Sequence, residues 1–120
     1  MIEKEWTTED GYAAQVVAQP MGHRCGYITV PSTHPAYGKD YADLDIEVHG
    51  SLTFGQGGTF GFDCAHFMDK KDESIMSDEY LRIEKMYSSF VSEDATIKGL
   101  AFCECECEFM SKQFKRMEQQ

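Results

Sequence analysis

The hydrophobic period of this chain changes in its second half, and this change most constrains the fold. Between Leu44 and Phe54, apolar side chains alternate with polar ones, which is typical of a half-buried strand. From Tyr80 onward, apolar positions recur at steps of three and four, which is typical of amphipathic helices. The sequence therefore predicts an α+β fold, with an antiparallel sheet of about four strands and two C-terminal amphipathic helices packed on one face.

The length of 120 residues fits a single domain. We expect a polar N-terminal lead-in at 1–12, a region holding the sheet and the site at 13–69, and helices at 77–91 and 99–118. Ser77 is the expected N-cap of the first helix, because a hydroxyl there can accept a hydrogen bond from a free amide. The apolar stripe of the second helix can serve as core or as the interface of a homo-oligomer.

Within 13–69, we predict strands at 13–19 and 24–30, a loop at 32–43, and a hairpin built from the alternating segment and residues 60–64. Pairing Phe54 with Phe60 keeps the apolar side chains of both strands on the core face. In that register the opposite face carries polar side chains, and it places His49 within hydrogen-bond reach of Asp63.

The charge excludes some classes of function. The formal net charge is −10, which argues against a general nucleic-acid binder and against binding to an anionic membrane surface. No apolar run approaches the roughly 18 residues of a membrane span, and the first residues lack the pattern of a signal peptide. We therefore expect a cytoplasmic protein whose five cysteines are free thiols.

All four histidines lie between residues 22 and 69, together with several cysteines and aspartates. One hypothesis is a metal site formed by His23, Cys25, Cys64 and His66, since each pair is spaced so that a strand points both members to one face. These are weak candidates, because structural zinc sites usually have wider spacing. We predict no cofactor.

A second hypothesis is catalysis, in which Asp63 orients His49 as a general base. A third hypothesis is a pocket for a small, nucleotide-like ligand, in which aromatic rings stack on a base and basic groups meet phosphates. The candidate ligand-binding residues are Arg24, Cys25, His34, Tyr37, Lys39, Asp45, His49, Asp63, His66 and Asp69.

Four motifs within residues 22–69 resemble a family of small phage, prophage and actinobacterial proteins. The motifs are HxCGYxxVP from His23, HPxYGKxY from His34, DxxVHGxLTF from Asp45 and GFDCAH from Gly61. The family has no known activity, so the resemblance implies a phage-related setting and a shared site. The matching positions are Cys25, Gly26, Tyr27, Pro31, His34, Pro35, Gly38, Asp45, His49, Gly50, Asp63, Cys64, His66 and Asp69.

We therefore expect a phage-type protein that binds and sequesters a small ligand, and we lean against an enzyme. The alternative is an acidic inhibitor that binds a protein of a host defence system or mimics a nucleic acid, and a small hydrolase or metal-dependent enzyme is third. The position of the acidic side chains discriminates between the first two. Acids gathered on one helix face, away from residues 22–69, would favour the inhibitor.

Overall fold

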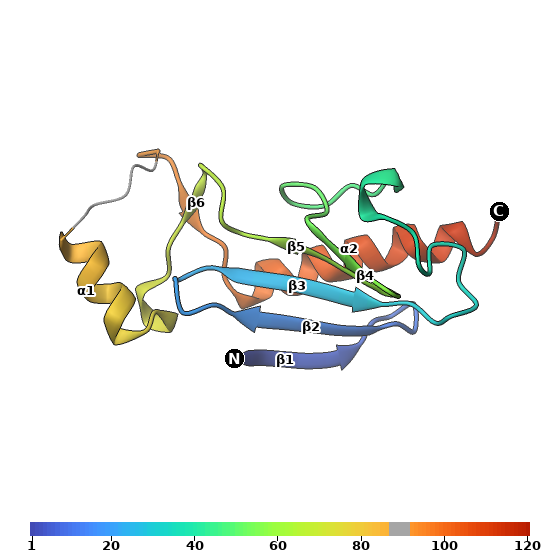
Figure 1. The fold of residues 1–120 in the computed structure, drawn as a ribbon, viewed down its shortest axis with the longest axis horizontal. Helices are drawn as coiled ribbons and strands as arrows, with labels where there is room; N and C mark the ends of the chain where they lie inside the picture. Colours follow the sequence, from blue (N-terminus) through green and yellow to red (C-terminus); the bar gives the residue numbers. More distant parts are fainter. Residues whose placement is uncertain (87–91) are drawn as a thin grey trace.

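A computed structural model of the chain describes residues 1–86 and 92–120. Its centre is a five-stranded antiparallel sheet in the order β1-β2-β3-β5-β4, with the C-terminal helix α2 lying along one face (Figure 1). These elements confirm the α+β class. Their bounds are Ile2–Thr7 for β1, Ala13–Ala18 for β2, Arg24–Thr29 for β3, Phe54–Gln56 for β4, Thr59–Asp63 for β5 and Leu100–Met117 for α2.

Helix α2 supplies one side of the hydrophobic core. Cys103, Cys107, Met110 and Phe114 recur at helical spacing and are fully buried, as the period predicted. The ring of Phe114 stacks on that of Phe60, with 5.2 Å between centroids. Each large apolar side chain buried here contributes on the order of 1.5–3 kcal/mol to the free energy of unfolding. α2 is therefore the main stabilising partner of the sheet.

The N-terminal segment is an edge strand, so the prediction of a polar lead-in at 1–12 is wrong. β1 pairs with β2 in antiparallel fashion. Its side chains reach α2, where Lys4 Nζ contacts Glu104 at 2.7 Å and Trp6 Nε1 donates to Glu108 at 2.9 Å. The strand was missed because polar contacts to the helix, rather than a run of apolar side chains, hold it in place.

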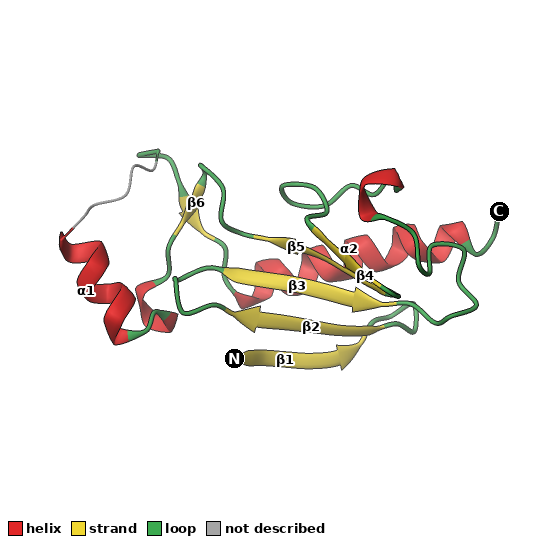
Figure 2. Ribbon diagram, in the orientation of Figure 1, coloured by secondary structure: helices red, strands yellow, loops and turns green. Residues whose placement is uncertain are grey.

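Residues 44–53 form no strand, contrary to the prediction. Figure 2 shows a long connection between β3 and β4, drawn as loop apart from the short 3-10 helix Tyr41–Asp43. Its backbone is hydrogen-bonded by side chains of α2: Gln113 bonds both the amide and the carbonyl of Glu47, and Glu106 accepts from the amide of His49 at 2.9 Å. Leu44, Ile46 and Val48 are thus partly buried against the core, and Leu52 is buried in it, without forming a strand.

The β4–β5 hairpin has a different register from the predicted one. Phe54 pairs with Gly61, and Gln56 pairs with Thr59, which leaves a tight turn with Gly57 at φ +61°. Two-residue turns with a positive φ match the twist of hairpins, and glycine adopts that conformation readily. Phe54 is therefore not on the core face beside Phe60; its ring makes an edge contact with Tyr27 instead.

The remaining elements lie beyond one end of the sheet (Figure 1). Strands β6 (Asp69–Lys70) and β7 (Thr96–Ile97) form a small parallel pair, and the 3-10 helix Glu73–Ile75 precedes α1 (Asp78–Met86). The amide of Tyr80 donates to Ser77 Oγ, which confirms the predicted N-cap. Helix α1 has no buried residue, so α2 alone of the two predicted helices covers the sheet face.

The first helix was predicted to continue through residues 87–91, and these residues lie outside the part of the chain that the structure describes. Within the described residues, no helix combines the length and the apolar character that crossing a membrane requires.

Candidate functional site

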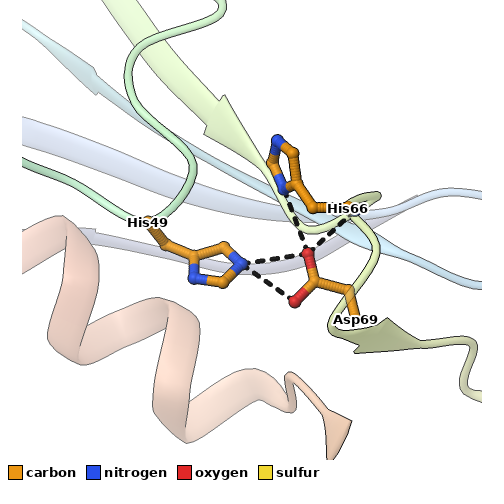
Figure 3. Close-up of side chains that lie close together, drawn as sticks. All are labelled: His49, His66 and Asp69. Atoms are coloured by element: carbon orange, nitrogen blue, oxygen red, sulfur yellow. Dashed lines mark hydrogen bonds and ion pairs between the residues drawn. The ribbon is translucent and has the colours of Figure 1, made fainter. Parts of the chain in front are cut away.

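Three side chains predicted as site residues meet at the end of the sheet near β6: His49, His66 and Asp69 (Figure 3). His49 Nε2 lies 2.9 Å from both carboxylate oxygens of Asp69, and His66 Nδ1 lies 3.1 Å from Oδ2. They come from separate places in the chain: a turn in the β3–β4 connection, the turn after β5, and the start of β6. The cluster therefore depends on the tertiary fold.

Asp69 is the buried centre of this cluster, with 1% of its side chain exposed. It also accepts a hydrogen bond from the amide of His66 at 3.0 Å, and Lys98 Nζ lies 3.2 Å from Oδ1. Burial by itself raises the pKa of this carboxyl. The hydrogen bonds from His49, the His66 amide, Lys98 and the His66 ring outweigh burial and lower the pKa below its usual value. Asp69 is thus a buried carboxylate held in its ionised form.

The two imidazole rings have defined orientations. An ionised carboxylate can only accept hydrogen bonds, so His49 Nε2 and His66 Nδ1 carry the protons that face Asp69. The opposite nitrogen of His66 lies 3.6 Å from Asp63 Oδ1. Asp63 is itself fixed by hydrogen bonds from Thr53 Oγ1 and from the amide of Ala65.

Aromatic and backbone contacts hold the two rings close together. The ring of Phe102, on α2, stands perpendicular to that of His49 at 5.2 Å, and the two imidazoles lie 5.5 Å apart. Gly50 has φ +66°, and a Cβ built there would overlap the His66 ring. A glycine at this position is therefore required both by the backbone and by the approach of His66.

The geometry places three metal-ligand types together. One donor atom each from His49, His66 and Asp69 lies within 4.8 Å of the others. Two histidines and one carboxylate form a recurrent ligand set for zinc and for non-haem iron. A tetrahedral site with bonds of about 2.05 Å separates its ligand atoms by about 3.3 Å. The nitrogens of His49 and His66 lie 2.9 and 3.1 Å from Asp69 Oδ2.

The pairing predicted for catalysis differs from the observed one. His49 contacts Asp69, and Asp63 contacts His66, whereas the predicted register placed His49 beside Asp63. The cause is that residues 44–53 form no strand. The chain runs past β5 instead and places His49 beside the start of β6.

The four candidates for the other metal site take separate roles. Cys64 Sγ lies 3.8 Å from Cys103 Sγ in the core, and Cys25 Sγ is contacted by Gln19. His66 belongs to the cluster with Asp69. Burial lowers the pKa of His23, while the charges of Asp63 and Asp69 oppose this effect, and His23 is not part of the group formed with Asp69.

Arg24 is buried and paired inside the protein. Its guanidinium binds Glu3 at 2.6 Å and Asp72 at 2.9 Å, and it also donates to the carbonyl of Lys98. With these contacts made, Arg24 links β3 to β1 and to the segment before α1. Its donors are therefore not free for the phosphate contact that we expected of it.

His34 is likewise a structural residue. Its Nδ1 accepts from the amide of Ala36 at 2.9 Å, so its Nε2 carries the proton and donates to the carbonyl of Phe114 at 2.7 Å. Phe114 lies in the last turn of α2, where carbonyls have no partner within the helix. His34 thus fastens the β3–β4 connection to the end of α2.

The other loop candidates are exposed and lie apart from the cluster. Tyr37 is 47% exposed, and Lys39 and Asp45 are also exposed. Asp45 borders a hollow of about 590 Å³ beside the C-terminal end of α2, together with Arg116. The predicted set of ligand-binding residues is therefore distributed over several places, and His49, Asp63, His66 and Asp69 are the members that meet.

Three contributors to the cluster were not among the residues predicted from the sequence: Lys98, Phe102 and Glu106. Their segment contains no histidine, and no spacing in it pointed to residues 49–69. Phe102 does fall beside the apolar stripe of α2, but a helical period alone does not indicate which side chain it will touch.

The acidic side chains of α2 face the protein's own segments. Glu104 pairs with Lys4, Glu106 accepts from the His49 amide, and Glu108 accepts from Trp6 and from the amide of Glu9. These glutamates therefore join α2 to β1 and to the site, and they do not form the separate acidic face that would favour an inhibitor.

Comparison of the chain with protein-family models, with curated proteins and with solved structures finds no match.

Proposed function

We propose that this protein binds a divalent transition-metal ion, of the zinc class, through His49, His66 and Asp69. The observation that carries the proposal is the convergence of two imidazole nitrogens on one buried, ionised carboxylate, at 2.9 and 3.1 Å. Without metal, N–H protons fill the space between these atoms. A metal ion would take the place of these protons, and each neutral imidazole would then carry its single N–H on the opposite ring nitrogen.

The surroundings of the cluster support this proposal. Histidine ligands commonly donate their second ring N–H to a carboxylate, which fixes the ring and raises its basicity as a ligand. Asp63 stands in that position behind His66. Lys98 lies at Oδ1 of Asp69, which leaves Oδ2, the oxygen facing both histidines, as the metal ligand.

The proposed ligand is thus a metal ion, whereas the sequence led us to expect a small, nucleotide-like ligand and no cofactor. A nucleotide pocket built from Arg24 and His34 is disfavoured, because both side chains are buried and hydrogen-bonded within the fold.

A zinc titration against a chromophoric chelator tests the proposal. We expect one site per chain, and a loss of affinity of about tenfold or more in Asp69→Asn and in His49→Gln. Glutamine can still donate to Asp69 but is a poor zinc ligand, so H49Q separates the metal role from the structural one. Cys105→Ala is the control, because it removes the exposed thiol that could bind zinc adventitiously.

Bound zinc is also expected to stabilise the fold. At a free concentration of 100 times the Kd, a ligand that binds only the folded state adds about 2.7 kcal/mol. If zinc leaves the melting temperature of the wild type unchanged, or if H49Q binds zinc as tightly as the wild type, the proposal is wrong.

A further inference from the structure

We infer that the metal held by His49, His66 and Asp69 keeps an open coordination position, and that this position takes an anionic oxygen of a small ligand, such as a phosphate or carboxylate group. The inference rests on the proposed function, because the ligand binds through the metal. It assigns the site to the open class of metal centres, which have three protein ligands and an exchangeable fourth.

The number of available ligands supports an open position. Within the described residues, three side chains of the metal-ligating types are grouped at the site: His49, His66 and Asp69. Residues 87–91 are Tyr, Ser, Ser, Phe and Val, so they add no side chain of these types. The carboxylate of Asp63 is held by Thr53 and Ala65 on the far side of the His66 ring, and that of Glu106 is held by the amide of His49.

The exposure of the ligands shows where the open position faces. The side chain of Asp69 is 1% exposed, that of His49 is 20% exposed and that of His66 is 37% exposed. The carboxylate thus forms the floor of the site and the imidazoles form its rim. A metal bound to all three would have its remaining position on the side of the more exposed His66 ring.

A divalent ion and Lys98 carry three positive charges, which balance the three negative charges of Asp69, Asp63 and Glu106. The site with its metal would thus be locally neutral, although the whole chain carries a net charge of −10, and an anionic oxygen would be attracted by the metal itself at the open position. Lys98 is well placed to contribute to this balance, since hydrogen bonds to the carbonyls of Met68 and Thr96 and to Thr96 Oγ1 fix its ammonium beside Asp69. Because 13% of its side chain is exposed, solvent screens this charge less than that of a surface lysine.

Cobalt(II) in place of zinc provides the test, because its visible absorption reports coordination number and ligand exchange. The full chain is loaded with one equivalent of Co²⁺ and titrated with inorganic phosphate and, separately, with acetate. We expect a saturable change in the cobalt spectrum, at millimolar concentrations or below. A response to phosphate that is at least about tenfold more sensitive than the response to acetate assigns the site to phosphate-bearing ligands, and the reverse order assigns it to carboxylates.

Other outcomes separate the two proposals. A cobalt spectrum that appears but does not respond to either anion overturns the open position and leaves metal binding intact. Phosphate binding of equal strength without metal, measured by calorimetry, also overturns the inference, since the anion then binds to side chains alone. If the cobalt spectrum does not appear, or if D69N gives the same spectrum, the proposed function fails and the inference fails with it.

Discussion

Replacing His34 with alanine tests most sharply whether the structure assigns this histidine correctly. The sequence placed it among the ligand-binding residues, whereas in the fold it joins the amide of Ala36 to the carbonyl of Phe114. The ring is 4% exposed and also packs at 5.8 Å from the rings of Tyr12 and Phe114. Its loss should therefore destabilise the protein without changing metal binding.

The magnitude follows from the two hydrogen bonds. Each buried group left without a partner costs about 1–3 kcal/mol, and the lost packing adds to this. We expect His34→Ala to lower the free energy of unfolding by about 3–4 kcal/mol, which corresponds to a fall of about 12–16 °C in Tm for a domain of this size. Lys39→Ala, an exposed change in the same loop, should stay within about 0.5 kcal/mol of the wild type.

Urea unfolding followed by the fluorescence of Trp6, the single tryptophan, measures these changes. Trp6 contacts Glu108 on α2, so its emission reports the packing of β1 against the helix. Zinc titration of the folded variant gives the second readout. If the free energy of unfolding of His34→Ala lies within about 0.5 kcal/mol of the wild type, the structural role of His34 is refuted. If the folded variant binds zinc more weakly than the wild type, His34 contributes to the metal site after all.

Three further predictions test other parts of the structure. Gly50→Ala should weaken zinc binding by about tenfold or more and lower the free energy of unfolding by about 1–2 kcal/mol, because the φ of this residue is positive and the new Cβ overlaps the His66 ring. Zinc titration measures the affinity and urea denaturation measures the stability. A zinc affinity equal to that of the wild type would contradict the prediction. Hydrogen bonds from Ser74, and then the Arg24 ion pair, outweigh burial and hold the pKa of Asp72 below its usual value. Asp72 therefore contributes stability above the unfolded pKa of about 3.9, and this contribution is lost as the pH falls through the lower folded pKa. Urea midpoints between pH 7 and pH 2 should show the advantage of wild type over Asp72→Asn shrinking in the acid range; a constant difference would be evidence against the ion pair. A disulfide reagent should modify one thiol rapidly in the native protein, and Cys105→Ala should abolish that phase, because the other four cysteines are buried; a second fast thiol would show that the core is open.

The elements that the sequence predicted well are those whose side-chain period is long or whose ends are marked. Helix α2 carries its apolar period over the whole of Leu100–Met117, so the alternation of Cys103, Cys105 and Cys107 with glutamates did not mislead. Strands β2 and β3 are bounded by Gly and Pro residues. In these places local pattern and tertiary packing favour the same conformation.

The wrong predictions arose where tertiary contacts replaced sheet pairing. Leu44, Ile46 and Val48 alternate like a strand, but their backbone is held by side chains of α2, and no period in the sequence can reveal such a partner. β1 was missed for the related reason that polar contacts fix it to the same helix.

The sequence predicted which residue types form the site better than it predicted which of these side chains contact one another. His49, His66 and Asp69 were all candidates, because polar ionisable side chains were concentrated between residues 22 and 69. That Asp69 rather than Asp63 binds His49 depends on the path of the β3–β4 connection, which could not be deduced from the alternating pattern. Arg24 and His34 show the opposite case, in which a residue type suited to ligand binding is used to join distant segments.

The central claim is that His49, His66 and Asp69 hold a metal ion. Anomalous diffraction at the zinc edge, from a crystal grown with one equivalent of zinc, tests it most directly. The account predicts one anomalous peak at about 2.0–2.2 Å from His49 Nε2, His66 Nδ1 and Asp69 Oδ2. A fully occupied peak elsewhere, with the hydrogen bonds of Asp69 unchanged, would contradict the account and show that the cluster is purely structural.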